Sequence, residues 1–299
     1  MRKKFFLLHI LSQLLRKDLE YINKYLLQKN EKVVNQVTFD FFFSQILDSK
    51  KLEKYLDSKK KIFSKSFFIK CVEQNEVFMK LNNTNFCSYD DELYPQLLKY
   101  IDSYPAGIFA RGNNNLLNKD CISVIGSRKA PYKNLKASYE ISAMLSECGY
   151  TIVSGGAYGC DIAAHKGALE SKSQQASTVV VLAGALDQIY PRGNLSVFKK
   201  ILDNEGLLVS EKIINSKIYP SDFPVRNRII SGLSKKLIVM AAGDNSGAML
   251  TVRNALDQGR DVLVYDSQSI IYQQGIETLI EDGAFVFTNY NELIDGLLL

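Results

Sequence analysis

The pattern of apolar and polar positions divides the chain into two regions. From residue 122 onward, short runs rich in β-branched residues alternate with stretches whose apolar residues recur at helical spacing. The expected strands are Ile122–Ile125, Tyr150–Val153, Thr178–Leu182, Leu207–Val209, Leu237–Met240, Asp261–Val264 and Ala284–Phe287. The expected helices include Lys133–Cys148, Ile162–Leu169, Ala248–Gln258 and Gly275–Glu281. This alternation predicts an α/β fold with a doubly wound, mostly parallel sheet and helices on both faces.

The first 82 residues have a different pattern. They are rich in Lys, Leu, Phe and Asn, contain neither Gly nor Pro, and are typical of several short helices. A cluster of three lysines at 59–61 is most simply a solvated helix face. The composition turns polar at residues 82–85. We therefore expect a small helical N-terminal domain over residues 1–82, followed by an α/β domain over residues 83–299.

The start of the chain has some features of a signal peptide, but its leucines recur at helical spacing and polar residues interrupt the apolar run. We expect an amphipathic helix there, and no stretch is long enough to span a bilayer. Five cysteines without C-x-x-C spacing and only two histidines argue against a disulfide framework and against a zinc site. Reduced thiols suit a cytoplasmic location. We also expect no contact with a membrane.

The charge distribution limits how the chain can bind anions. The net charge is +5, but residues 1–120 carry 20 basic and 14 acidic residues, whereas residues 121–299 carry 17 and 18. The α/β region therefore lacks the overall basic excess of a histone-like protein. Any anion that it binds must be held by a local pocket.

Four loops of the α/β region have a composition suited to anions. In doubly wound folds, ligands bind beyond the carboxyl ends of the strands, where free backbone N–H groups of helix N-termini face the ligand. The four segments are Gly126-Ser127-Arg128-Lys129, Ser154-Gly155-Gly156-Ala157-Tyr158-Gly159-Cys160-Asp161, Phe223–Ser234 and Asp244–Ala248. One such loop alone would be an ordinary turn as often as a phosphate site. Four on one edge of a sheet favour a site for a polyanion.

The third segment places Arg226 and Arg228 around Asn227, where we expect an irregular loop to give way to a helix. Two guanidinium groups at this junction could meet a phosphate backbone from two directions. The simpler alternative is that each arginine pairs with a nearby acid. Phe223 could fill the core or stack on a base.

Other residues favour structural roles. Asp161 is expected to cap its helix, and His165, among small residues, is expected to be a structural histidine. The sequence shows no paired carboxylates, no Ser/His/Asp set and no metal-ligand cluster, so we expect no catalytic residue, metal or cofactor. A dinucleotide site is the main alternative, but the loops read G-S-R and G-G-x-x-G rather than G-x-G-x-x-G.

Taken in order, the motifs resemble those of the DNA-processing protein A family (DprA, also called Smf). The resemblance covers roughly residues 85–290. It is carried by Tyr89-Asp-Asp-Glu-Leu-Tyr-Pro-Gln-Leu-Leu, Phe109-Ala-Arg-Gly, Val124-Ile-Gly-Ser-Arg, the segment from Ser154 to Leu169, Ala183-Gly-Ala-Leu-Asp-Gln-Ile-Tyr-Pro-Arg-Gly-Asn, Phe223-Pro-Val-Arg-Asn-Arg-Ile-Ile-Ser-Gly-Leu-Ser, Ser246-Gly-Ala-Met-Leu-Thr and Gly259-Arg260.

The resemblance implies an extended Rossmann-like domain that binds single-stranded DNA, protects incoming strands during natural transformation and helps to load the recombinase RecA. Family members generally form dimers and are not known as enzymes. Many relatives begin with a small helical domain; some end with a winged-helix domain, which we do not expect here. The candidate DNA-binding residues are Gly126, Ser127, Arg128, Lys129, Ser154, Gly155, Gly156, Tyr158, Gly159, Phe223, Arg226, Asn227, Arg228, Ser246 and Gly247.

The chain departs from the family pattern at three places. Tyr158 stands where the family usually has arginine, Ala241 where it has an acid, and Asp266-Ser267 where it has Pro-Gly. One lost cation would weaken DNA binding and lower its salt dependence by about one unit of slope. Two alternatives stay open. One is a nucleotide N-glycosidase-like enzyme on the same scaffold, although its P-G-G-x-G-T-x-x-E loop is missing; the other is a degenerate family member with reduced DNA binding.

Overall fold

The computed structural model describes residues 65–171, 177–244, 246–268 and 274–298, together with Phe6, His9, Ile10 and Gln13. Most of the expected N-terminal helical domain, including its lysine cluster, lies outside the described residues. The part of that region that the structure does describe contains helix α5 (Lys65–Leu81), which leads almost directly into the sheet.

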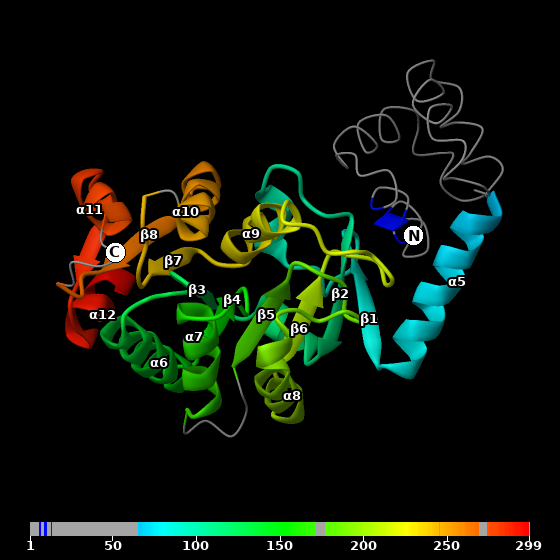
Figure 1. The fold of residues 1–299 in the computed structure, drawn as a ribbon, viewed down its shortest axis with the longest axis horizontal. Coiled ribbons are helices and arrows are strands. Elements are labelled where there is room, and N and C mark those ends of the chain that lie inside the picture. The colour runs from blue at the N-terminus through cyan, green and yellow to red at the C-terminus, as the bar shows by residue number, and fades with distance from the viewer. Residues whose placement is uncertain are drawn as a thin grey trace, which may run out of the picture.

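A single mixed sheet runs through the described residues in the order β1-β2-β6-β5-β4-β3-β7-β8-β9 (Figure 1). Its strands are β1 (Thr84–Ser88), β2 (Gly107–Gly112), β3 (Cys121–Ile125), β4 (Thr151–Ser154), β5 (Thr178–Leu182), β6 (Leu207–Ser210), β7 (Lys236–Val239), β8 (Asp261–Tyr265) and β9 (Phe285–Phe287). Strands β3 to β9 are the seven strands predicted from the sequence, and each begins and ends within one residue of its predicted bounds. They pair with one another in parallel. The predicted doubly wound, mostly parallel sheet is confirmed.

The sequence analysis missed β1 and β2, which extend the sheet in antiparallel fashion beyond β6. The segment Thr84–Ser88 contains Asn and Ser and shows no clean alternation, so its local preference for a strand is weak. Long-range packing supplies what local preference lacks. The ring of Phe86 covers Gly107, where an added Cβ would lie 2.1 Å from its Cζ, and lies 5.1 Å from the ring of Phe109.

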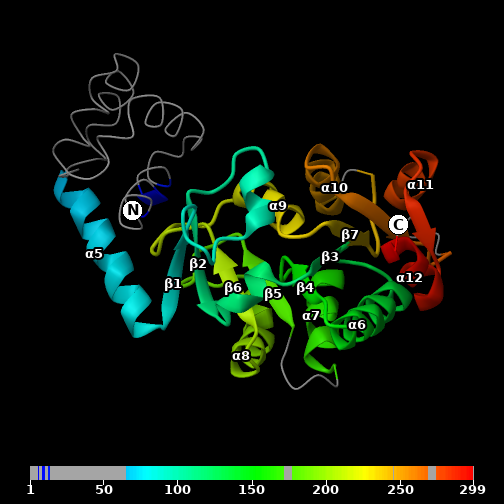
Figure 2. The same cartoon turned by 180° about the vertical axis from the view of Figure 1, so that it is seen from behind.

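Helices cover both faces of the sheet (Figures 1 and 2). The helices that follow α5 are η2 (Gln96–Tyr100), η3 (Asn114–Asn118), α6 (Tyr132–Glu147), α7 (Cys160–Leu169), η4 (Arg192–Asn194), α8 (Leu195–Asp203), α9 (Asp222–Gly232), α10 (Gly247–Asp257), α11 (Gln274–Glu281) and α12 (Tyr290–Leu298). Helices α6, α7 and α8 lie on one face, and α9 and α10 lie on the other. All four helices named from the sequence are present.

Residues of one strand contribute alternately to two cores. In β3, Ile122 and Val124 pack in the cluster that α6 and α7 cover, whereas Ile125 packs in the cluster on the α9 and α10 side. Because both faces are covered, the central strands β3 and β5 are buried throughout and mostly apolar rather than alternating, as expected for parallel sheets.

The order of the strands creates a switch point between β3 and β7. From β3 the chain proceeds outward through β4, β5 and β6, and it then returns to place β7 on the other side of β3. The connections that leave β3 and β7 therefore diverge to opposite faces and leave a crevice at the carboxyl ends of these strands. Ligands bind at such positions in open α/β sheets.

The described N-terminal residues pack against the α/β domain. The ring of Phe6 lies 5.1 Å from that of Phe86, and Nε2 of the fully buried His9 lies 2.7 Å from the carbonyl oxygen of Glu211. Phe6 and Ile10 thus share a hydrophobic cluster with β2 and β6. Within the described part of the chain, no helix is both long enough and apolar enough to cross a membrane.

The close packing of α7 on α6 gives a first prediction. A Cβ at Gly167 would lie 2.0 Å from the backbone oxygen of Tyr139, so Gly167→Ala must push the two helices apart. We expect a loss of about 1–3 kcal/mol in unfolding free energy, measured by urea denaturation. Gly247 has no neighbour within 4 Å of an added Cβ, and Gly247→Ala should change stability by less than about 1 kcal/mol. Equal stability of both variants would contradict the helix spacing described here.

Candidate nucleic-acid interface

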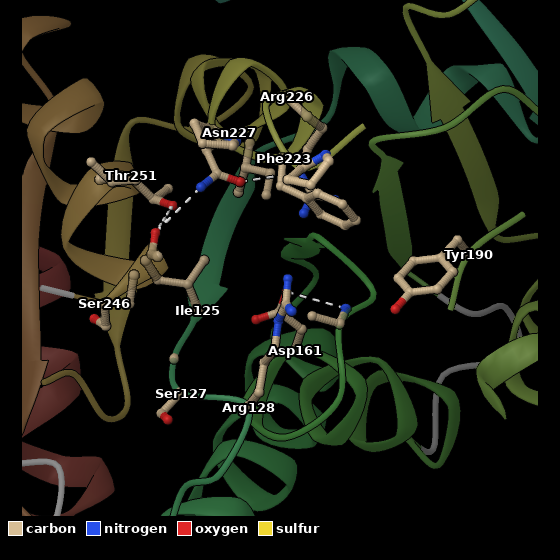
Figure 3. Close-up of a pocket in the computed structure, with 18 of the residues that line it drawn as sticks. Ile125, Ser127, Arg128, Asp161, Tyr190, Phe223, Arg226, Asn227, Ser246 and Thr251 are labelled. Carbon is tan, nitrogen blue, oxygen red and sulfur yellow. Dashed lines mark hydrogen bonds between the residues drawn. The ribbon is translucent and has the colours of Figure 1, made fainter. Parts of the chain in front are cut away.

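A pocket of about 880 Å³ opens at the switch point between β3 and β7 (Figure 3). Its walls come from the loop after β3, the first turns of α9 and α10, and the segment before α9. The lining includes nine of the sequence-predicted residues: Gly126, Ser127, Arg128, Lys129, Phe223, Arg226, Asn227, Ser246 and Gly247. The structure thus brings residues as far apart in the sequence as Gly126 and Gly247 into one cavity.

The loop after β3 is held close to the start of α7. The N–H of Ser127 donates to the Ala241 oxygen at 2.9 Å, and the N–H of Cys160 donates to the Ser127 oxygen at 3.3 Å. A Cβ at Gly126 would lie 2.6 Å from the Cys160 sulfur, so only glycine allows this approach. The loop carries the exposed side chains of Arg128 and Lys129 at the mouth of the pocket.

The loop after β4 lines the pocket only through Ala157, and Asp161 at the start of α7 lines it as well. Gly159 has φ +83°, and a Cβ there would lie 2.2 Å from the Ser127 oxygen. The Ser154 hydroxyl donates to the Val124 oxygen at 2.6 Å and is therefore used within the sheet. Of the candidates in this loop, Gly155 and Tyr158 line a small neighbouring cleft, whereas Ser154, Gly156 and Gly159 line neither cavity.

Helix α9 begins at Asp222. The segment that starts at Phe223 is therefore helical from its first residue, whereas the sequence analysis expected an irregular loop there. The Asp222 carboxylate accepts hydrogen bonds from the Tyr219 N–H and from Lys212 Nζ, both at 2.8 Å, and so stabilises the first turn. Arg226 and Arg228 are consequently both helical. Residues two positions apart on a helix are rotated by about 200° around its axis, so the side chains of Arg226 and Arg228 point to opposite sides of α9. The structure therefore does not bring the two guanidinium groups together around one cavity.

Arg226 lines the pocket but is buried, and it joins three segments. Its guanidinium donates to the Gly155 oxygen at 2.7 Å, to the Val181 oxygen at the end of β5, and to Asn227 Oδ1 at 3.1 Å. Only 7% of its surface is exposed. Burial lowers the pKa of Arg226 to about 10, and the charge of Asp161 opposes that shift. Most of its donors are used inside the protein, which makes it a support for the pocket wall.

Asp161 is placed differently from the expected helix cap. It lies in the first turn of α7, after the N-cap Gly159, and its carboxylate accepts the N–H of Ala157 at 3.4 Å. Burial raises its pKa, whereas the positive charge of Arg226 and the surrounding N–H groups favour the carboxylate. Asp161 therefore balances the buried guanidinium and shapes the loop from Gly155 to Gly159.

Arg228, unlike nine of the other candidate residues, does not line the pocket. Its Nη2 lies 2.8 Å from both carboxylate oxygens of Glu211, and both side chains are largely buried. Gln258 donates to the Arg228 backbone oxygen at 3.1 Å. The Arg228–Glu211 pair is the simpler alternative that the sequence analysis raised, an arginine paired with a nearby acid. The pair anchors α9 to the residue that follows β6.

The first turn of α10 presents backbone N–H groups of a helix N-terminus to the pocket. Ser246 precedes the helix without making a side-chain cap, and Gly247 is exposed. Asn227 Nδ2 and Thr251 Oγ1 both donate to the Gly247 oxygen at 3.3 Å, which ties α10 to α9 (Figure 3). Because the positive end of the helix dipole faces the cavity, this turn suits an anion.

Phe223 and Arg128 meet across the pocket. The Arg128 guanidinium carbon lies 5.3 Å from the centre of the Phe223 ring, within range of a cation–π interaction. The ring of Tyr190 lies 5.8 Å from that of Phe223 at 73°. Phe223 is partly exposed and lines the cavity, which leaves it accessible to a flat ligand.

His165 is a structural histidine, as expected. Its Nδ1 lies 2.7 Å from the Thr178 hydroxyl, which itself donates to the Ile152 oxygen at 2.9 Å, so Nδ1 carries the proton. Burial lowers the pKa of His165 to about 3, and the charge of Arg226 acts in the same direction. Among the described residues, no group of three or more His, Cys, Asp or Glu is arranged to hold a metal ion.

Comparisons with known proteins agree with this architecture. The model of the family described as DNA recombination-mediator protein A matches residues 85–298. Protein Smf of Escherichia coli is 33% identical over 233 residues, which cover 78% of this chain but only 62% of that protein, so the chain spans less than two thirds of this relative.

Two solved structures resemble the chain. DNA processing protein A of Streptococcus pneumoniae has a TM-score of 0.78 at 26% identity, covering 99% of this chain and 97% of that one. DNA processing protein A of Helicobacter pylori has a TM-score of 0.64 at 27% identity, covering 72% and 96% respectively. The structure of the latter is described as giving insight into its single-stranded DNA binding mode.

The buried histidines predict acid sensitivity. The ordinary pKa of 6.5 falls to about 3 in His165 and, mainly by burial, to about 4 in His9. Between these values and pH 6.5 each of these histidines binds more protons in the unfolded chain than in the folded one, so both lower the stability as the pH drops below 6.5. Each histidine contributes up to about 1.4 kcal/mol per pH unit.

In urea denaturation at pH 7, 6 and 5, His165→Gln should remove one of these two contributions. Its stability should therefore fall less steeply with decreasing pH than that of the wild type, whatever its stability at pH 7. Parallel stability curves for the two proteins would show that His165 is not buried as a neutral ring.

The Arg228–Glu211 pair predicts a stability effect. Arg228→Ala leaves the Glu211 carboxylate largely buried without its cation, and we expect a loss of about 3 kcal/mol in unfolding free energy. The double variant Glu211→Gln, Arg228→Gln should recover a large part of it. As a matched control, Lys136→Ala breaks the exposed pair with Glu140 and should change stability by less than about 1 kcal/mol. A loss in Arg228→Ala no larger than in this control would contradict the pairing.

Proposed function

The chain belongs to the DNA recombination-mediator protein A family, and on that premise we propose that the pocket at the β3–β7 switch point binds single-stranded DNA. One observation carries the proposal. Arg128 and Lys129, the N–H groups that begin α10, and the ring of Phe223 all line one cavity where open sheets bind ligands. The single-stranded DNA binding of the Helicobacter pylori relative supports the choice of ligand.

In this mechanism the phosphates are held by groups that are free to turn toward them. Arg128 and Lys129 supply positive charge at the mouth, and Ser127 and Gly247 supply hydroxyl and N–H donors. Arg226 acts indirectly, because its donors hold the Gly155 and Val181 carbonyls that shape the wall. Since these contacts are to the backbone, binding is salt-dependent and nearly independent of sequence.

The aromatic lining explains why an unpaired strand is preferred. Phe223 can stack on a base only if one face of that base is free, and bases within a duplex are stacked on both faces. A pocket recessed between α9 and α10 also admits a flexible strand more readily than a rigid duplex.

The wider role is part of the same proposal. We extend to this chain the protection of incoming strands, the loading of the recombinase RecA and the formation of a homodimer, as a cytoplasmic protein of natural transformation and recombination. Membership of the family supports this extension.

We further propose that the protein acts without catalysis. The buried Ala241 stands at the end of β7 where the family pattern has an acid, and its backbone oxygen accepts the Ser127 N–H. The rival N-glycosidase reading predicts release of free base from nucleoside monophosphates. Chromatography of such mixtures after incubation with the protein should show no free base.

The pocket predicts a specific salt dependence. In fluorescence anisotropy with labelled oligo(dT), Arg128→Ala should weaken binding and reduce the slope of log K against log salt by about one unit, because one phosphate contact is lost. The double variant Glu211→Gln, Arg228→Gln should leave the slope unchanged, because Arg228 faces away from the pocket.

Lys119→Ala provides a matched control, since this exposed cation precedes β3, at the end of the strand opposite the pocket. It should leave both affinity and slope unchanged. The placement of the site is wrong if Arg128→Ala behaves like Lys119→Ala. Duplex DNA of the same length should bind more weakly than the single strand, and equal binding would count against the proposal.

A further inference from the structure

A small cleft adjoins the main pocket and is lined by three aromatic side chains from three separate segments. Tyr158 comes from the loop after β4, Tyr190 from the segment before η4, and Phe223 from α9. The two cavities share Arg128, Tyr190 and Phe223 in their linings, so the cleft continues the pocket.

The Tyr158 side chain is held in place yet accessible. A Cβ added to Gly193 would lie 2.5 Å from Tyr158 Oη and 3.1 Å from its Cε1, so the outer end of the ring rests on that glycine. Asn194 Nδ2 donates to the Gly156 oxygen at 2.9 Å and fastens this contact region to the loop that carries Tyr158. Nevertheless, 47% of Tyr158 is exposed. A supported, half-exposed ring loses little conformational freedom when a flat ligand stacks on it.

The two sides of the crevice differ in chemistry. Figure 3 shows Tyr190 on the side opposite Ser127 and Ser246. The side of Ser127 and Ser246 offers hydroxyls, N–H groups and the start of a helix, whereas the other side offers aromatic rings. Tyr190 is also 47% exposed, and its ring lies 5.8 Å from that of Phe223.

The charges near the cleft do not make it a phosphate site. Two cations line it, Arg128 and Arg226. Arg226 is buried and donates to the Gly155 and Val181 carbonyls, and Arg128 lies over the Phe223 ring toward the main pocket. The cleft itself holds only about 20 Å³. A flat group stacked on the exposed part of the Tyr158 ring would therefore lie over the cleft and meet aromatic surface rather than positive charge, which suits an unpaired nucleobase.

We propose that Tyr158 is a stacking platform for one base of the strand, next to the nucleotides whose phosphates occupy the main pocket. This inference rests on the proposed function and specifies which part of the ligand each side of the crevice takes. Because every base has a π face, the platform favours unpaired bases without reading sequence.

The test compares two labelled oligonucleotides of equal length and charge, oligo(dT) and an abasic strand with tetrahydrofuran in place of each nucleoside sugar and base. Wild-type protein should bind oligo(dT) more tightly than the abasic strand. Tyr158→Ala should weaken oligo(dT) binding about tenfold, leave abasic binding unchanged and leave the salt slope unchanged. Tyr158→Phe keeps the ring and should keep the affinity.

Tyr100→Ala is the matched control, because Tyr100 is 81% exposed on η2 and lines neither cavity. Gly193→Ala keeps Tyr158 but occupies the place where its ring rests, and it should weaken oligo(dT) binding without affecting the abasic strand.

Three results would overturn the inference. Tyr158→Ala could bind oligo(dT) as well as Tyr100→Ala does, or it could lose affinity for both oligonucleotides equally, which would show an effect on the loop rather than on a base. Wild-type protein that binds neither oligonucleotide would overturn the proposed function as well.

Discussion

The buried guanidinium of Arg226 is the interaction on which the pocket depends. It joins the carbonyl of Gly155 after β4 to the carbonyl of Val181 at the end of β5, and it reaches both from α9 on the other side of the crevice. A Cβ at Gly155 would lie 2.7 Å from Arg226 Nη2, so this loop must carry glycine for the guanidinium to fit. This hydrogen bond connects the loop after β4 directly to α9.

The proposed function requires a domain without excess positive charge to hold a polyanion. Residues 121–299 carry 17 basic and 18 acidic side chains, so their summed charge cannot attract DNA. The pocket instead concentrates oriented N–H groups, a helix N-terminus and two exposed cations at one point of the sheet edge. Other cations form ion pairs with neighbouring acids, as Arg228 does with Glu211.

Helix α9 connects this site to the remainder of the molecule. Its Arg226 and Asn227 face the pocket and α10, whereas its Arg228 faces Glu211, whose backbone oxygen lies 2.7 Å from the ring nitrogen of His9. Helix α9 therefore lines the pocket on one side. On its other side it binds Glu211, the same residue that His9 contacts. The ring of Phe223 at its first turn completes the crevice.

Much of the fold could be predicted because its signals are local. Apolar runs of strand length alternating with helical spacing located seven strands to within one residue, and strand order in such folds places their following loops on one edge. The motifs themselves identified the family. The added strands β1 and β2 could not be found in this way, because Thr84–Ser88 becomes a strand through its pairing with β2 and the packing of Phe86.

The sequence by itself determined which loops carry the chemistry, since residue type and spacing around the strands are local properties. Only the tertiary structure decided which of those residues face the pocket. The Arg-Asn-Arg segment shows the reason: where the helix starts sets the direction of each side chain, and contacts more than 15 residues away decide the rest. Those contacts bury Arg226 against Gly155 and pair Arg228 with Glu211, and no pattern within the segment specifies either partner.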